Sequence, residues 1–200
     1  MASLTINKDI KEMNFDQLFK EISPEDISAN VFTLIGKNFY VITAGNKEQY
    51  NSMVGSGGGL GFIFKKPATW CIFQQCRYTL ELIMKEQSYT IAYFPDKYRN
   101  QMMFLGSKTG RDSNKMKEVE LTNIQTPYGN MSFKEAKLIF ECKLVQVTTP
   151  DINDFYTQEA KTWVNNMYKD QKEIRKYVFG EIIHVWVKKT GNKHKGTYKN

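Results

Sequence analysis

The sequence predicts one mainly β domain, an antiparallel barrel or sandwich with short helices inserted between its strands. Short runs of aromatic and β-branched residues recur between turn-forming residues, beginning with a hairpin signature. These runs do not alternate regularly with helices, which disfavours a doubly wound nucleotide-binding fold. Two hundred residues, of which 41% are hydrophobic, are enough for one well-filled core.

The strands are predicted from β-rich runs bounded by turn residues. Two such runs at residues 30–45 surround a short turn containing Gly36 and Asn38, which is typical of a hairpin. An opening hairpin favours a meandering antiparallel sheet. The later strands are expected at Ala68–Gln74, Ser88–Phe94, Ala136–Val147 and Val178–Lys188.

The helices are predicted from capping residues and helical spacing. Thr79 is the expected N-cap of the first helix, and Pro95 with Asp96 begins the second. Apolar residues recur at helical spacing in the third. The predicted helices are Leu80–Lys85, Pro95–Gly106 and Asp154–Lys169.

The composition argues against several classes of protein. No apolar run is long enough to span a membrane, and residues 1–13 lack the apolar stretch of a secretory signal, so we expect a cytoplasmic protein with no membrane partner. Cys71, Cys76 and Cys142 form no CxxC pair and are expected to be buried thiols. The two histidines are not spaced as metal ligands, and no metal site is expected.

The net charge of +7 is concentrated at the C-terminus. Five lysines and no acidic residue lie in residues 188–200, so the rest of the chain is close to neutral and no nucleic-acid partner is expected. We therefore divide the chain into an N-terminal extension, a single domain and a basic flexible tail. These parts are residues 1–23, 24–189 and 190–200.

Three clusters of residues are candidates for ligand binding. In Asn51–Gly61, glycines let backbone N–H groups approach a ligand, although the segment matches neither a Rossmann nor a Walker motif and is equally typical of a flexible loop. In Gln74–Thr79, Arg77 stands beside a helix N-terminus and favours an anion site, or else an ordinary surface ion pair. Ser107–Lys115 combines cations and hydroxyls, as phosphate sites and solvated loops both do.

Taken together and in this order, the clusters resemble the flavin reductase-like FMN-binding family, and within it a flavoredoxin-like branch. The resemblance implies a split β-barrel, usually a homodimer, that holds flavin mononucleotide (FMN). It rests on four segments between Pro24 and Lys189. They are Asn51-Ser52-Met53 with Ser56 and Gly58–Gly61, Arg77-Tyr78-Thr79, Gly106–Asp112 with Lys115, and Gly180-Glu181-Ile182.

The resemblance also implies a reaction and a set of cofactor-binding residues. The reaction is hydride transfer from NAD(P)H to the flavin and on to an unidentified acceptor, with no essential nucleophile. The expected residues around the flavin ring and ribityl chain are Asn51, Ser52, Met53, Val54, Gly55, Ser56 and Gly57. Those expected at the phosphate end are Arg77, Tyr78, Thr79, Ser107 and Lys115.

Three positions depart from the pattern of this branch. Val54 stands where a threonine is usual, Gly57 where a tryptophan is usual, and Arg175 is the nearest candidate where a histidine is common. Arg175 is thus a candidate substrate contact, and the catalytic residues stay unassigned. Two other functions remain open: a non-catalytic FMN-binding or electron-carrier protein reduced by a partner, and a related barrel that binds another planar ligand such as haem.

Overall fold

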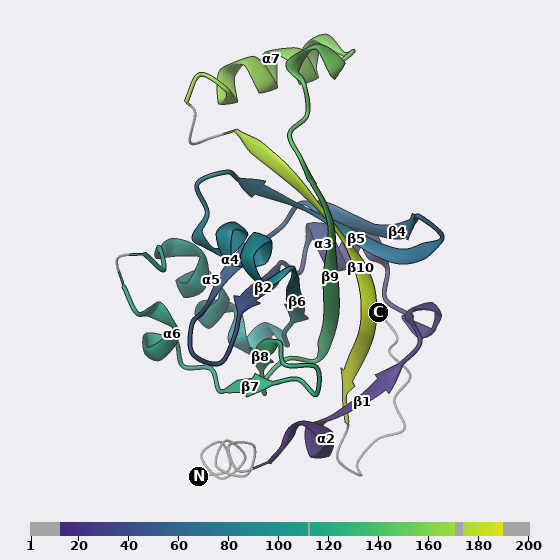
Figure 1. Cartoon of the computed structure of the whole chain (residues 1–200), viewed down its shortest axis with the longest axis vertical. Coiled ribbons are helices and arrows are strands. Elements are labelled where there is room, and N and C mark those ends of the chain that lie inside the picture. Colours follow the sequence, from purple (N-terminus) through teal and green to yellow (C-terminus); the bar gives the residue numbers. More distant parts are fainter. Residues whose placement is uncertain (1–12, 112, 171–173, 190–200) are drawn as a thin grey trace.

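The computed structural model describes residues 13–111, 113–170 and 174–189, and shows a curled sheet with short helices around it (Figure 1). Each strand pairing within these residues is antiparallel, which confirms the predicted mainly β, antiparallel class. Residues 1–12 of the predicted extension and the predicted basic tail lie outside the described residues.

The bounds of the elements follow the chain order. The strands are β1 (Phe19–Ile22), β2 (Tyr40–Gly45), β3 (Tyr50–Gly55), β4 (Gly58–Ile63), β5 (Lys66–Gln74), β6 (Ser88–Tyr93), β7 (Asn123–Gln125), β8 (Met131–Phe133), β9 (Leu138–Thr148) and β10 (Arg175–Lys188). The α-helices are α2 (Phe15–Leu18), α3 (Val31–Gly36), α4 (Tyr78–Glu86), α5 (Arg99–Ser107), α6 (Lys115–Glu118) and α7 (Gln158–Met167). Short 3-10 turns are η1 (Pro24–Asp26), η2 (Asp96–Tyr98) and η3 (Ile152–Asp154).

The connection between β3 and β4 closes the sheet on itself. The strand order is β3-β2-β6-β9-β10-β5-β4, and β1 pairs with β10. Only Ser56 and Gly57 separate β3 from β4, although these strands stand at opposite ends of the order. Because such a link spans about 11 Å at most, the two edges of the sheet have to approach each other. The sheet therefore curls into a barrel, and the glycine-rich segment lies where its edges meet.

The predicted hairpin at residues 30–45 is wrong in its first half, which forms helix α3. The side chain of Asn30 caps this helix by accepting a hydrogen bond from the backbone N–H of Thr33 (3.1 Å). Leu34 and Ile35 pack into the barrel core on one side of the helix. Capping and burial thus override the β propensity of the run. The first hairpin is instead β2–β3, whose strands pair directly.

The later elements follow the predictions more closely. The four later strands and the three helices are confirmed as β5, β6, β9, β10, α4, η2 with α5, and α7. The prediction that Thr79 caps α4 is wrong, because the N-cap is Arg77 and Thr79 is the second residue of the helix. The Thr79 hydroxyl instead accepts a hydrogen bond from Asn51 of β3. The glycine-rich segment is also mostly strand, with only a two-residue turn.

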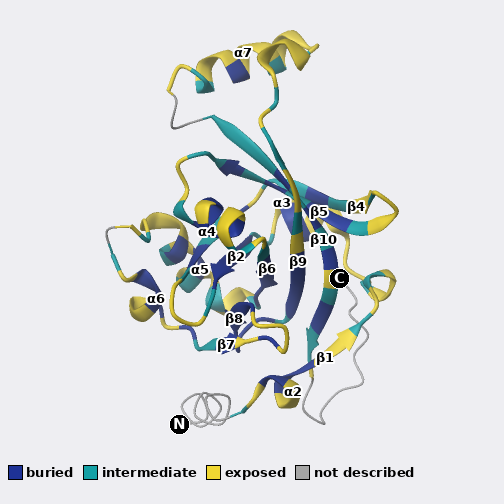
Figure 2. Ribbon diagram, viewed as in Figure 1, coloured by how far each residue is buried: buried dark blue, intermediate teal, exposed yellow. Residues whose placement is uncertain are grey.

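The core lies in two layers on the two sides of the curled sheet. Most of β6 and parts of β9 and β10 are buried (Figure 2). The inner layer fills the barrel with aromatic residues such as Tyr40 and Tyr89, and burial raises the pKa of both phenols. The outer layer is covered by α2, α5 and α6. Cys71 and Cys142 are buried as predicted, whereas Cys76 is exposed because it lies on the turn that follows β5.

Helix α7 lies apart from the barrel, on an arm formed by the end of β9 and the start of β10 (Figure 1). Most of its surface is exposed (Figure 2). None of the described helices is long and apolar enough to cross a membrane. In the part of the chain that the structure describes, no group of three His, Cys, Asp or Glu side chains is arranged to hold a metal ion.

Candidate functional site

The three sequence clusters meet at the N-terminus of α4. Asn51 of β3 donates a hydrogen bond from Nδ2 to Thr79 Oγ1 of α4 (2.8 Å), and both side chains are buried. The loop after α5 closes on this pair, because a Cβ added at Gly110 would lie 2.1 Å from Asn51 Oδ1. Only glycine fits there while the Asn51–Thr79 bond is kept. One residue from each cluster thus takes part in a single buried contact.

Arg111 fastens the same loop to α4. Its guanidinium pairs with the carboxylate of Glu81, donates to the carbonyl of Cys76 (3.4 Å) and lies 5.2 Å from the centre of the Tyr78 ring. Exposed contacts of this kind contribute about 0–1 kcal/mol each, so they position the loop more than they stabilise the fold. The surface ion pair considered for Arg77 is therefore made by Arg111.

Arg77 and Lys115 bring two positive charges into the same region. Arg77 is exposed, and within the described ranges no carboxylate forms an ion pair with it. Lys115 is 2% exposed, and its Nζ donates to the carbonyls of Leu105 and Lys108 at 2.9 Å each. Burial, and then repulsion from Arg77, lower the pKa of Lys115 to about 8. An anion bound between the two cations would relieve this repulsion.

The first turn of α4 adds partial positive charge to the same place. Arg77 makes no side-chain hydrogen bond as the N-cap, and the first N–H groups of a helix have no partner within it. Oriented N–H groups at a helix N-terminus favour anions. Thr79 anchors this turn through its buried side chain, so its backbone N–H is the group available to a ligand.

The glycine-rich turn is held firmly at Gly55 and is less tightly packed at Gly57. A Cβ at Gly55 would lie 2.4 Å from the ring of Tyr40, so this glycine is required by packing. The Tyr40 hydroxyl donates to the carbonyl of Gly57 (2.6 Å) and fixes the turn. At Gly57 itself, the nearest atom to an added Cβ is Ile72 Cδ1 at 3.6 Å, which is ordinary contact. The backbone of this turn is therefore held in place, and a small side chain at Gly57 would fit beside Ile72.

The other predicted residues of this strand face different surroundings. Ser52 is fully buried and shares a hydrogen bond with the hydroxyl of Thr43 (2.7 Å), so only its backbone can serve a ligand. Met53 packs against the inner core layer, and Val54 packs against the outer layer beside Gly106 of α5. Ser56 is exposed at the turn.

Two predicted residues are not tied to the contacts at α4. The hydroxyl of Ser107 donates to the carbonyl of Phe104 (3.0 Å), and no hydrogen bond among the described residues joins Ser107 to Arg77 or Lys115. Arg175 begins β10 and pairs in register with Gln74 at the end of β5. It therefore lies beside the connection that leads into α4.

Sequence reasoning missed the roles of Gly110, Arg111 and Tyr40. Gly110 and Arg111 were part of the third cluster, but nothing in their spacing shows that they contact Asn51 and Glu81. Tyr40 carries no motif, and its contact with the glycine-rich turn depends on strand pairing between β2 and β3. A glycine inside a cation-rich loop is the one signal that indicated a close approach of the backbone.

Comparison with known proteins places these residues in a wider group. A family model described as a flavin reductase-like domain matches residues 34–200. An FMN-binding protein from Thermus thermophilus is 16% identical in sequence and superposes with a TM-score of 0.59. The alignment covers 84% of this chain and 77% of the Thermus chain. A flavoredoxin from Methanosarcina acetivorans is also 16% identical, with coverages of 83% and 76% and a TM-score of 0.57.

A further match, from Shewanella frigidimarina, is named for its split barrel domain. It is 19% identical, with coverages of 84% and 80% and a TM-score of 0.58. At such identities the likeness concerns the fold, and the expected split-barrel fold is confirmed. No curated protein sequence is significantly similar to this chain.

Proposed function

The chain belongs to the family of flavin reductase-like domains, and from this we propose that it binds FMN and transfers a hydride from NAD(P)H to it. The reduced flavin then passes its electrons to an acceptor still to be identified. The observation that carries the proposal is the meeting of Arg77, Lys115 and the N-terminus of α4 around the buried Asn51–Thr79 contact.

The residues at α4 fit the phosphate end of FMN. A phosphate dianion would satisfy the exposed guanidinium of Arg77 and the first-turn N–H groups of α4. It would also offset the burial and the repulsion from Arg77 that lower the pKa of Lys115 to about 8. The Asn51–Thr79 bond keeps the first turn of α4 against β3, so these donors stay oriented.

The β3–β4 turn fits the flavin ring. Bound FMN supplies the redox chemistry, since it can accept a hydride and release electrons. The protein would supply the backbone N–H groups of this turn, which the Tyr40 hydroxyl holds in place. In a bound flavin, these groups would stabilise negative charge on the reduced ring. Arg175, beside the connection to α4, is placed to attract a phosphate or carboxylate of the reductant or acceptor.

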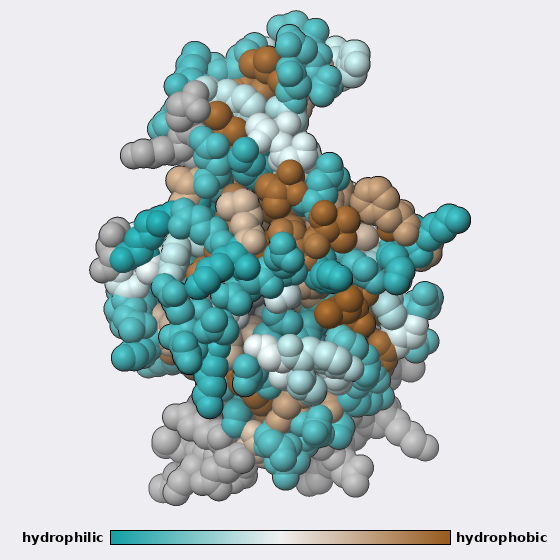
Figure 3. All heavy atoms as spheres, in the orientation of Figure 1, coloured by the Kyte–Doolittle hydropathy of each residue, from teal (hydrophilic) through white to brown (hydrophobic). Residues whose placement is uncertain are grey.

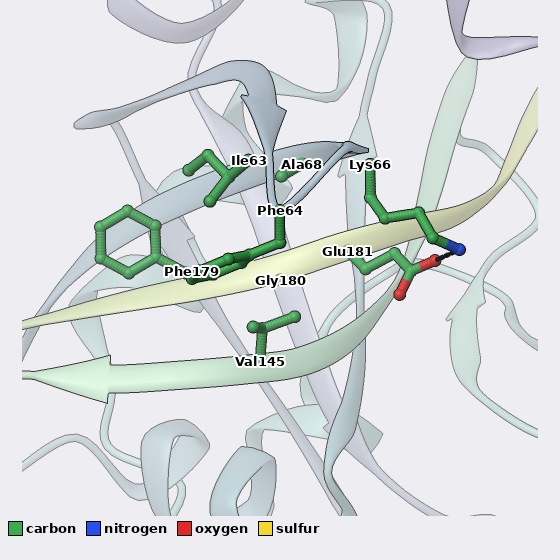
Figure 4. A pocket seen from close by; sticks show the side chains of 8 residues that line it. All are labelled: Ile63, Phe64, Lys66, Ala68, Val145, Phe179, Gly180 and Glu181. Atoms are coloured by element: carbon green, nitrogen blue, oxygen red, sulfur yellow. Dashed lines mark hydrogen bonds and ion pairs between the residues drawn. The ribbon is translucent and has the colours of Figure 1, made fainter.

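The proposal includes a homodimer, because one face of the barrel exposes large apolar side chains. Phe62 and Phe64 on the β4–β5 hairpin are 70% and 69% exposed, and Val145 of β9 is also exposed. Hydrophobic side chains gather between α7 and this hairpin (Figure 3). Phe64, Val145 and Phe179 surround a hollow of about 270 Å³ (Figure 4). A second copy would cover this face and the last strand of the sheet order, β4.

Sedimentation of two matched variants tests the dimer. Replacing Phe62 and Phe64 by serine removes two exposed rings from the hairpin, and a monomer at micromolar concentration is expected. Met103→Ser is the control, because Met103 is 52% exposed on α5, which packs against β3. If the wild type, the double variant and the control variant are all dimers, this face is not the interface.

The redox proposal is tested by anaerobic absorbance spectra of the protein with FMN, before and after NADH and then NADPH. A bound-flavin band that bleaches is the expected result and identifies the nicotinamide used. A band that persists with both nucleotides but bleaches with dithionite contradicts the reductase and favours the electron carrier. Absence of bound flavin contradicts the FMN assignment itself.

A further inference from the structure

One face of the β4–β5 pair carries glycines on one strand and large side chains on the other. Gly59 of β4 stands opposite Trp70 of β5 in the antiparallel register. Because side chains alternate between the two faces of a strand, Gly57 lies on the same face as Gly59, and Ile72 on the same face as Trp70. Ile72 is also the side chain that a Cβ added at Gly57 would contact. The turn proposed for the flavin ring and Trp70 therefore share one continuous surface.

The indole of Trp70 occupies the space that a side chain at residue 59 would need. A Cβ added at Gly59 would lie 2.2 Å from Cζ2 and 2.3 Å from Cη2 of Trp70, so the ring keeps this place only while residue 59 is glycine. Trp70 points away from the barrel interior, because its neighbour Cys71 belongs to the inner core layer. Trp70 is half-buried, which leaves part of it open to a ligand.

The spacing along these strands fits a flavin whose phosphate lies at α4. Strands rise about 3.3 Å per residue, so Gly59 stands about 7 Å from Gly57, and the three fused rings of a flavin are longer than this. A flavin ring that starts beside Gly57 and extends along β4 thus reaches Trp70. Strand β5 runs on from Trp70 to Gln74, and a short turn leads from there to Arg77 at the N-terminus of α4. One strand therefore connects Trp70 with the residues proposed for the phosphate.

Gly57 itself offers the flavin no side chain, although a tryptophan is usual at this position in the branch that the sequence resembles. We propose that Trp70 supplies the missing aromatic wall, and that the flavin ring packs against the indole on β5 instead of a side chain of the turn. Offset-stacked aromatic rings attract each other, and the electron-rich indole suits the electron-poor oxidised flavin. The inference rests on the proposed function, because it requires bound FMN with its ring at the β3–β4 turn.

The emission of bound flavin tests this contact. An excited flavin takes an electron from an indole that it touches, and the electron returns in the dark, so emission is lost without net reaction. Trp70→Leu should make bound FMN and bound riboflavin several-fold brighter. It should also weaken the binding of both about two- to tenfold, because the two ligands share the ring. Trp163→Leu is the control and should change neither, since Trp163 is 54% exposed on α7, which lies apart from the barrel (Figure 1).

Gly59→Ala tests the same contact while the indole is kept. The added Cβ forces the ring of Trp70 off β4, so the emission of bound flavin should rise as it does in Trp70→Leu. Gly61→Ala is the matched control, because a Cβ there lies 3.6 Å from Trp70 Cζ3, an ordinary contact, and emission and affinity should stay as in the wild type. Thermal unfolding of each variant shows whether the fold is kept.

The outcomes separate this inference from the proposed function. If FMN fails to bind to the wild type, the proposed function fails and the inference fails with it. If FMN binds but neither Trp70→Leu nor Gly59→Ala changes its emission or affinity, the proposed function stands and the inference is overturned. Brighter flavin in Trp163→Leu alone would assign the aromatic contact to α7, which also overturns the inference.

Discussion

At the N-terminus of α4, side chains from three separate segments contact one another, whereas at the β3–β4 turn the backbone is held and side chains are small or absent. The first region leaves no room, since a Cβ on Gly110 would strike Asn51. The second leaves room at Gly57, where an added Cβ meets only an ordinary contact. Two of the departures from the family pattern, Val54 and Gly57, concern the second region, whereas Arg175 lies beside the connection that leads into α4.

The two regions therefore differ in how much change they tolerate. The Asn51–Thr79 contact at α4 is buried and lies against Gly110, so a change at one of these residues disturbs the others. The β3–β4 turn presents backbone groups that most side-chain changes leave in place. We therefore expect substitutions at the N-terminus of α4 to change FMN affinity strongly. Substitutions at the β3–β4 turn should change the surroundings and reactivity of the flavin ring more than FMN affinity.

The largest expected effect comes from Arg77→Ala combined with Lys115→Ala. Each charge-assisted hydrogen bond contributes about 1.5–3 kcal/mol, so the Kd of FMN should rise at least about a hundredfold. Fluorescence titration with FMN and with riboflavin, which lacks the phosphate, measures the effect. Riboflavin affinity should stay within a few-fold of the wild type.

Lys115 also holds two carbonyls near the end of α5, so the double variant needs two controls. Arg77→Ala alone removes an exposed side chain and should weaken FMN binding about tenfold or more without lowering the melting temperature. Lys108→Ala removes a nearby exposed cation that pairs with Glu118 and should have little effect. Unchanged FMN affinity in the double variant would refute the phosphate assignment.

The next largest effect is expected from Gly110→Ala, and Gly57→Ala is its matched control. The added methyl at Gly110 forces Asn51 away from Thr79, which should cost about 1–3 kcal/mol of stability and weaken FMN binding about tenfold. The same change at Gly57 meets Ile72 at ordinary contact distance and should leave stability within about 0.5 kcal/mol. Chemical denaturation and FMN titration of both variants check the pair, and equal destabilisation by the two would contradict the comparison.

The pH dependence of FMN affinity should report on Lys115. Its pKa is lowered to about 8, and a bound phosphate favours the protonated form, so binding requires proton uptake above pH 8. The Kd of FMN should therefore rise between pH 7 and 9, by about tenfold at most. Riboflavin titrated over the same range is the control and should show no such rise. A flat FMN profile would mean that Lys115 does not act on the phosphate.

Gly57→Trp has the smallest expected effect on affinity. It places an aromatic ring where the family branch usually has one, and the Cβ of the new side chain would meet Ile72 at ordinary contact distance. An aromatic contact contributes about 0.5–1.5 kcal/mol, so FMN should bind a few-fold to about tenfold more tightly. Titration and the shape of the bound-flavin spectrum measure this, and weaker binding would show that the turn does not face the ring.

Much of the fold could be predicted because strand and helix signals are local. The strands β5, β6, β9 and β10 and the helix α7 were found from periodicity and turn residues alone. The exception is instructive: Val31–Gly36 is β-rich in composition, yet the Asn30 cap and burial of Leu34 make it helical. A short segment has no dominant local preference for helix or strand, so the residues that pack against it determine which one forms.

For the candidate site, the sequence by itself determined which residue types are available: glycines before β4, an arginine ahead of α4, and a cation-rich loop. The fold, and not the local sequence, brings Asn51 to Thr79, 28 residues away, and pairs Glu81 with Arg111, 30 residues away, rather than with Arg77. It also decided that Lys115 is buried against carbonyls near the end of α5. The physical reason is that backbone preference acts between near neighbours, whereas burial, charge pairing and close approach depend on how the curled sheet brings distant segments together.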